Sequence, residues 1–91
     1  MTQSIVLRWE KRTHEKKQYY RVVLQRDLLG DLIIMRVWGG IGRASGQIRQ
    51  NIVDCVEDGF KKIDDIIKRL IKKGYELTSG LSDLQAFHLA A

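Results

Sequence analysis

Apolar and polar residues alternate along four stretches in the first half of the chain, at residues 5–11, 18–26, 32–38 and 47–53. An alternation with a period of two places one set of side chains on each face of a β-strand. Short polar or glycine-containing segments separate the stretches, as is typical of hairpin connections. We therefore expect four consecutive strands that form an antiparallel meander.

From Asp54 onward the apolar spacing changes from two residues to 3.6, which is the period of an α-helix. The apolar stripe comprises Val56, Phe60, Ile63, Ile67 and Leu70, and is continued by Ile71. Asp54 and Glu57 have the spacing of a capping box, and two lysines followed by Gly74 favour a helix end. The pattern predicts one long helix over about 55–73, packed across one face of the sheet in an α+β fold.

Four acid-before-base pairs at four-residue spacing lie on the polar side of this helix: Glu57 with Lys61, Asp58 with Lys62, Asp64 with Lys68, and Asp65 with Arg69. Each such pair stabilises a helix by about 0.2 to 0.5 kcal/mol. The pairs explain these charges without a ligand.

The residues after the helix are the least regular part of the chain. We place a domain at 1–77 and a C-terminal tail at 78–91, which forms either a short helix or a loose end. The apolar tail residues Leu81, Leu84 and Phe87 either fold back on the sheet or pack against a second copy of the chain.

The length of 91 residues is that of one domain. No stretch approaches the roughly 20 apolar residues that span a bilayer, and the N-terminus has no hydrophobic region of a signal peptide. We therefore expect a cytoplasmic protein with no membrane partner.

The net charge of +5 is concentrated in the strand-rich part. Residues 1–53 carry ten Lys or Arg against four Asp or Glu, whereas residues 54–91 carry six against seven. A cationic surface favours a polyanionic partner, although basic proteins that bind no polyanion are also common.

The chain lacks a constellation of catalytic or metal-binding residues. Cys55 is the only cysteine and has no histidine nearby in sequence, so a buried structural role is favoured over a nucleophile. His14 and His88 are isolated and lack the spacing of a zinc site. We expect no enzymatic activity, no metal and no cofactor.

The segment 37–50 is rich in glycine and contains Trp38, which Arg36, Arg43 and Arg49 flank. A flat aromatic ring beside guanidinium groups is suited to stack on a base or a ribose. The alternative is that Trp38 only closes the end of the hydrophobic core. Trp9 alternates with apolar residues of its strand and is expected inside the core.

Several short motifs occur in an order and spacing that resemble the WGR domain. They are Tyr19-Tyr20-Arg21-Val22, Leu29-Gly30, Trp38-Gly39-Gly40-Ile41-Gly42, Gly46-Gln47 and Lys72-Lys73-Gly74-Tyr75. This domain occurs in poly(ADP-ribose) polymerases and in bacterial proteins that carry it alone or in molybdate-regulator-like chains. The resemblance covers about residues 5–77, and the sequence looks like a bacterial stand-alone member of the family. It implies an antiparallel sheet with one long helix packed across it.

The resemblance also implies contact with DNA near a strand break. In the polymerases the motif Trp packs on a sugar of the DNA backbone, and the motif Arg connects this contact to neighbouring domains. Trp38 and Gly39 match the first two motif positions, but the third is Gly40, and the nearest arginine is Arg43. The matched region contains no NAD-binding catalytic domain, so no transferase activity is implied.

We therefore expect a non-enzymatic module that binds nucleic acid, with DNA favoured. The expected binding residues are Trp38, Arg36, Gly39, Gly40, Arg43, Gln47 and Arg49, with Lys16 and Lys17 as outer contacts. The alternative is a protein-interaction module without nucleic-acid binding, with a homodimer formed through the tail or through an unpaired sheet edge.

Overall fold

The computed structural model describes residues 4–44 and 46–83. Its elements are β1 (Ile5–Arg12), β2 (Lys17–Arg26), β3 (Leu32–Gly40), β4 (Gly46–Val53), α1 (Val56–Lys72) and β5 (Glu76–Ser79). The four expected strands and the expected helix are all present, and their ends lie within two residues of the predicted ones. The α+β fold with an antiparallel sheet is confirmed.

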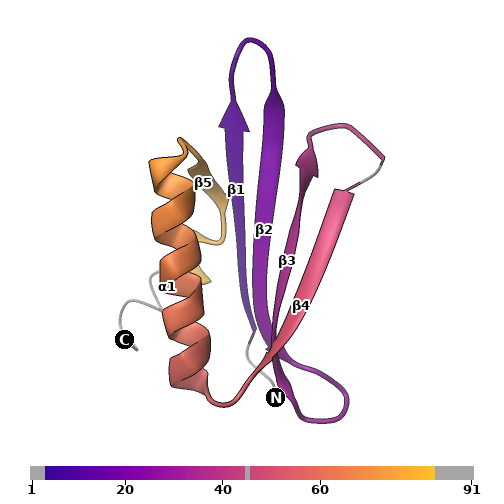
Figure 1. The fold of residues 1–91 in the computed structure, drawn as a ribbon, viewed down its shortest axis with the longest axis vertical. Coiled ribbons are helices and arrows are strands. Elements are labelled where there is room, and N and C mark those ends of the chain that lie inside the picture. Colours follow the sequence, from indigo (N-terminus) through magenta and orange to yellow (C-terminus); the bar gives the residue numbers. More distant parts are fainter. Residues whose placement is uncertain (1–3, 45, 84–91) are drawn as a thin grey trace.

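The sheet has five strands in the order β4-β3-β2-β1-β5, all antiparallel to their neighbours (Figure 1). The four-stranded prediction is therefore incomplete. After α1 the chain returns along the free edge of β1, where Leu77 pairs with Trp9 and Glu76 with Glu10. Four residues are too few to show a clear alternation, which is why the sequence pattern did not reveal β5. The sheet thus includes Thr78 and Ser79, the first two residues assigned to the tail.

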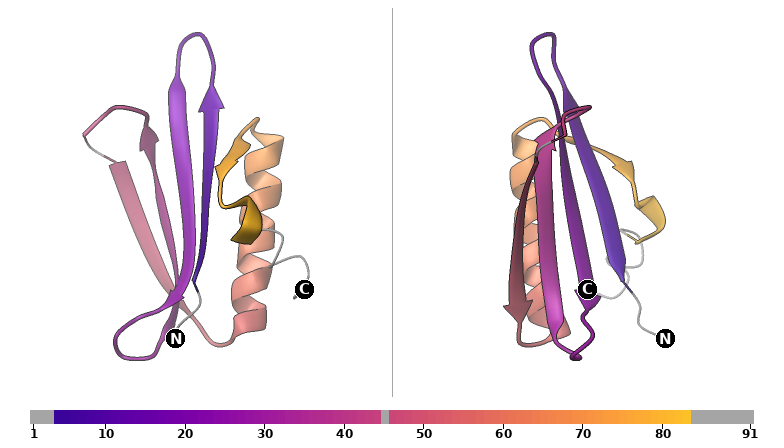
Figure 2. Two further views of the ribbon diagram at one scale, coloured as in Figure 1. Left: turned by 180° about the vertical axis from the view of Figure 1, so that it is seen from behind. Right: turned by 90° about the vertical axis from the view of Figure 1, so that its right-hand side faces the viewer.

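Helix α1 lies on one face of the sheet (Figures 1 and 2). We call this the helix face; it carries Leu7, Trp9, Tyr20, Val22, Leu24, Ile34, Arg36 and Trp38 together with their cross-strand neighbours. The opposite side is the far face, which carries Arg8, Glu10, Arg21, Val23, Met35, Ile48, Gln50 and Ile52. Trp9 is only 4% exposed, which confirms its predicted place in the core.

The buried side of α1 differs in part from the predicted stripe. Ile63, Ile67 and Leu70 are buried as expected, and Ile66 joins them. Ile71 is 59% exposed, because it lies outside the arc of the helix on which Ile63, Ile66, Ile67 and Leu70 are buried. Val56, the first helical residue, is 41% exposed. The part of α1 that packs against the core is therefore its middle and its C-terminal end.

The two ends of α1 compare differently with the prediction. The N-cap is Cys55 and no side chain caps the helix, so the predicted capping box is wrong. At the other end Gly74 has a φ of 92°, its amide donates to the carbonyl of Ile71 at 3.0 Å, and the Tyr75 amide donates to that of Leu70 at 2.9 Å. These two bonds form a Schellman motif, which confirms the predicted stop at Gly74.

One of the four charge pairs expected on α1 forms an ion pair. Lys68 Nζ lies 2.8 Å from Asp64 Oδ2, and this contact raises the pKa of Lys68. No ion pair joins the members of the other three pairs, all of which lie among the described residues. Residues 4–44 and 46–83 include no helix that is long and apolar enough to cross a membrane.

Candidate nucleic-acid interface

Trp38 lies between Tyr20 of β2 and Gln47 of β4 on the helix face. Its ring stacks on that of Tyr20, with centroids 5.7 Å apart and planes within 11°. The Tyr20 ring also meets the edge of Tyr75, with a centroid distance of 6.4 Å. Trp38 remains half-buried, unlike Trp9. The structure thus fixes the orientation of the Trp38 ring and leaves part of it accessible.

Two arginines lie beside Trp38 on the same face of the sheet. Arg36 lies two residues before it on β3, and Arg49 is the cross-strand partner of Arg36 on β4. Arg36 Nη2 donates to Asn51 Oδ1 at 3.5 Å, the outer limit of a hydrogen bond. Arg49 and Gln47 are both exposed. Trp38, Arg36, Gln47 and Arg49 therefore form one continuous surface, which we call the Trp38 surface.

A groove of about 360 Å³ continues this surface toward α1. Its lining consists of Ile34, Arg36, Asn51, Lys62, Asp65, Ile66 and Arg69. The four-residue spacing accounts for Lys62 and Arg69 as partners of Asp58 and Asp65 within the helix. It does not reveal that Lys62 and Arg69 lie beside Arg36. Their seven-residue spacing corresponds to two helical turns, and this was the signal that put them on one side of α1. The groove contains three cationic side chains and one carboxylate.

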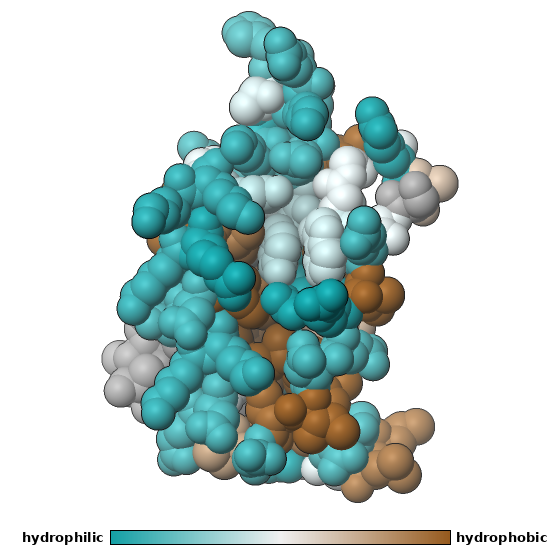
Figure 3. Space-filling view, viewed as in Figure 1, coloured by the Kyte–Doolittle hydropathy of each residue, from teal (hydrophilic) through white to brown (hydrophobic). Residues whose placement is uncertain are grey.

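The β1–β2 turn and the turn after β3 lie at the same end of the sheet, which is uppermost in Figure 1. We call this end the tip. It contains a hollow of about 410 Å³ lined by Thr13, His14, Glu15, Lys16, Lys17, Gln18, Gly40, Ile41 and Arg43. Figure 3 shows hydrophilic residues over the tip and over α1, whereas hydrophobic residues gather lower down between α1 and the strands. The tip is thus a polar, cationic end.

Arg43 folds back over Gly40 within this hollow. Its amide donates to the Gly40 carbonyl at 3.2 Å, and Gly42, with a φ of 79°, turns the chain between them. A Cβ atom at position 40 would lie 2.9 Å from Arg43 Cδ and 3.2 Å from Nε. Gly40 therefore makes room for the side chain of Arg43.

The nine residues expected to bind nucleic acid fall into two neighbouring groups. Trp38, Arg36, Gln47 and Arg49 lie on the helix face, and Lys16, Lys17, Gly40 and Arg43 line the hollow at the tip. Gly39 joins the groups within β3. The geometry suits a ligand that passes from the tip onto the helix face.

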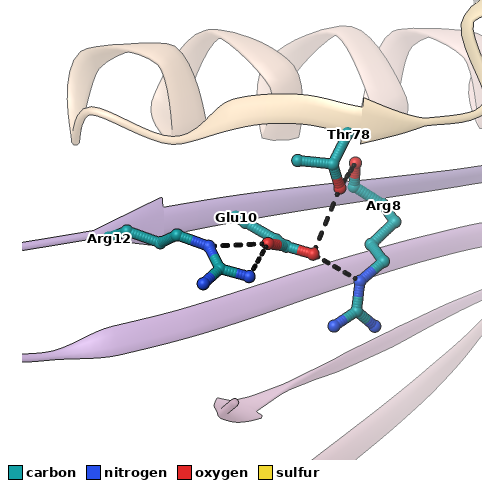
Figure 4. Close-up of polar contacts among 4 residues, drawn as sticks. All are labelled: Arg8, Glu10, Arg12 and Thr78. Atoms are coloured by element: carbon teal, nitrogen blue, oxygen red, sulfur yellow. Dashed lines mark hydrogen bonds and ion pairs between the residues drawn. The ribbon is translucent and has the colours of Figure 1, made fainter.

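A second cluster, on the far face, was not singled out from the sequence. Glu10 accepts hydrogen bonds from Arg8 Nε at 3.0 Å and from Arg12 Nη2 at 3.0 Å (Figure 4). Thr78 donates to the carbonyl of Arg8 at 3.3 Å, and the Arg8 guanidinium lies 4.8 Å from the Tyr19 ring centroid. The two arginines lower the pKa of Glu10. This cluster links β5 to β1, and the alternation in β1 already placed its three charges on one face.

Cys55 is exposed at the start of α1, so the expectation of a buried cysteine is wrong. Within the part of the chain that the structure describes, no group of three or more His, Cys, Asp or Glu residues is arranged to hold a metal ion. His88 lies outside the described residues.

A family model described as the WGR domain matches residues 3–80. The match spans all five strands and α1, and includes both groups of candidate binding residues. It confirms the resemblance that the sequence motifs indicate. No curated protein and no solved structure gives a significant match.

Proposed function

Because the chain belongs to the WGR-domain family, we propose that it is a non-enzymatic module that binds nucleic acid, DNA in preference to RNA. The observation that carries the proposal is the half-buried Trp38 ring, which stacks on Tyr20 and has Arg36 and Arg49 beside it on the same face of the sheet. An oriented aromatic ring beside guanidinium groups recognises the sugar or base at a strand end together with its phosphates.

Stacking on Trp38 contributes the orientation-dependent part of the binding. Base–aromatic stacking contributes about 1 to 3 kcal/mol per base and tolerates any sequence. Tyr20, which itself contacts Tyr75, holds the Trp38 ring in place, so little side-chain freedom is lost on binding. The expected ligand is a frayed, nicked or terminal nucleotide whose sugar or base is free to meet the ring.

The cationic side chains contribute the salt-dependent part. Arg36 and Arg49 lie along the Trp38 surface, and Lys16, Lys17 and Arg43 lie at the tip. A backbone that passes over Trp38 meets cations before and after the ring. About three phosphate contacts give a slope of log K against log salt of about −2 to −3.

The test is fluorescence anisotropy with blunt, nicked, 5′-phosphorylated and single-stranded oligonucleotides at several salt concentrations. We expect tightest binding to the nicked or 5′-phosphorylated DNA, with the slope given above. Trp38→Ala should weaken this binding about tenfold or more, the equivalent of about 1.4 kcal/mol. The proposal is ruled out if Trp38→Ala binds with wild-type affinity, or if no oligonucleotide binds at protein concentrations below about 100 μM at low salt.

Arg21 offers a matched control for the arginines. It is exposed on β2 but points to the far face, away from Trp38. Arg49→Ala should reduce the magnitude of the salt slope by about one contact, whereas Arg21→Ala should leave it unchanged. Equal effects of the two substitutions would show that binding depends only on total charge.

A further inference from the structure

Strand β4 forms one edge of the sheet and has the features of a strand that accepts a partner. It is eight residues long, pairs with β3 without irregularity, and is exposed everywhere except at Val53. The opposite edge, β5, has only four residues and a register shift between Arg8 and Trp9. Short and irregular edges resist further pairing, whereas long regular ones favour it.

The free hydrogen-bonding groups of β4 can be assigned from the ladder. The amide of Ile41 donates to the carbonyl of Lys17 at 2.9 Å, so the odd-numbered residues of β3 direct their peptide groups toward β2. The even-numbered ones then face β4, where Trp38 pairs with Gln47 and Arg36 with Arg49. It follows that Ile48, Gln50 and Ile52 direct their amides and carbonyls away from the sheet.

The side chains of this edge are weakly protected from association. Ile48 is 63% exposed and Ile52 is 66% exposed, both on the far face. Gln50 lies between them, and Arg49 is the only charged residue of the strand. Natural edge strands commonly carry charged side chains, proline or a bulge that blocks pairing; β4 has Arg49 as its single charge and neither proline nor a bulge.

We propose that β4 pairs antiparallel with β4 of a second copy of the chain, with Gln50 opposite Gln50 of that copy. In this register Ile48 lies opposite Ile52 of the second copy, and Ile52 opposite its Ile48. Arg49 lies opposite Asn51, so like charges do not face each other.

The neighbouring registers are less favourable. A shift of the partner strand by two residues in one direction places Arg49 directly opposite Arg49, which is destabilising. The same shift in the other direction places Ile48 opposite Asp54 and Ile52 opposite Gln50. Only the register centred on Gln50 pairs both isoleucines with isoleucines. The strand is therefore self-complementary in one register.

The two-fold axis of such a dimer passes between the two Gln50 residues, perpendicular to the sheet. This axis keeps both helix faces on the same side of a continuous ten-strand sheet. The two Trp38 surfaces would then lie side by side across the β4–β4 junction. The dimer does not require nucleic acid: its isoleucine contacts lie on the far face, whereas Arg49 and Asn51 face each other across the junction on the helix face.

Sedimentation equilibrium of the full chain over a wide concentration range tests the pairing. We expect a monomer–dimer equilibrium that Ile48→Lys and Ile52→Lys each weaken at least tenfold. Ile71→Lys is the matched control, because Ile71 is similarly exposed (59%) but lies on α1, and it should leave the equilibrium unchanged. A monomer at every concentration, or a dimer that survives Ile48→Lys, overturns the proposal.

Disulfide trapping tests the register, in a Cys55→Ser background that removes the exposed native thiol. Directly opposite residues of a hydrogen-bonded pair have Cα atoms about 5.5 Å apart, within reach of a disulfide. Gln50→Cys should therefore give a cross-linked dimer on oxidation. Gln47→Cys should not, because the two copies of residue 47 are offset by six residues, about 20 Å. Equal cross-linking of both variants overturns the register.

Discussion

The side chain of Arg43 occupies the space that a side chain at position 40 would need, with Cδ 2.9 Å from the place of a Cβ atom there. Position 40 is the third position of the family motif, where the WGR pattern has arginine and this chain has glycine. A guanidinium is therefore delivered beside residue 40 from a position three residues farther on. The absence of the motif arginine does not remove a cation from the tip.

This relationship predicts that Gly40 and Arg43 act together in binding. Gly40→Ala should displace Arg43 and weaken DNA binding several-fold, and Arg43→Ala should do the same, because each change removes the same cation from the hollow. The double variant should bind no more weakly than Arg43→Ala alone. A double-mutant cycle by fluorescence anisotropy measures the coupling, expected at about 0.5 to 3 kcal/mol. Strictly additive losses would contradict the shared role.

Trp38 and Trp9 differ in accessibility, which predicts a fluorescence signal for binding. Trp9 is 4% exposed in the core, whereas Trp38 is half-buried at the surface. DNA should therefore quench the emission of Trp38 and leave that of Trp9 unchanged. Titration of Trp9→Phe should show the full quenching, and titration of Trp38→Phe should show almost none. Quenching that persists in Trp38→Phe would place the ligand elsewhere.

The sequence was sufficient for the elements that are long and regular. The alternation in β1 to β4 and the 3.6-residue period of α1 each extend over several repeats, and Gly74 combines a helix stop with a positive φ. β5 was missed because four residues pairing with β1 leave too short a pattern. Local periodicity does not contain the information that the chain returns to the sheet after α1.

The candidate site could be predicted in composition but not in arrangement. Trp38, Arg36 and Arg49 share a face because of the two-residue period, which the sequence shows. The approach of Arg43 to Gly40, and of Lys62 and Arg69 to Arg36, depends on turn geometry and on how α1 crosses the sheet. Those contacts join parts of the chain that sequence spacing alone does not relate.

The Glu10 cluster predicts a pH-dependent contribution to stability. Hydrogen bonds from Arg8 and then Arg12 lower the pKa of Glu10 below its ordinary value of 4.5. A lowered pKa in the folded state stabilises the fold above about pH 4.5, and this stabilisation is lost as the pH falls through the folded-state pKa. The difference in urea midpoint between wild type and Glu10→Gln should therefore be constant from pH 7 to 5 and shrink below.

Glu15 provides the control for that experiment, because it is exposed in the β1–β2 turn and forms no ion pair among the described residues. Glu15→Gln should not reproduce the change in midpoint. A difference between wild type and Glu10→Gln that stays the same down to pH 3 would show that the two arginines do not hold the Glu10 carboxylate in solution.

Gly59 predicts where α1 is least tolerant of a larger side chain. It is buried in the helix, and a Cβ atom there would lie 3.1 and 3.3 Å from the two methyl carbons of Leu24. Gly59→Ala gains about 1 kcal/mol of helix propensity but must displace Leu24, so its net effect should be within about 1 kcal/mol of zero. Gly59→Leu should lower the free energy of unfolding by about 1 to 3 kcal/mol, because Leu24 and Val53 already occupy the space beside position 59. Lys61→Leu, at an exposed position of the same helix, should change it by less than about 0.5 kcal/mol. Urea denaturation measures all three, and a Gly59→Leu variant as stable as Lys61→Leu would show that α1 does not pack this closely on β2.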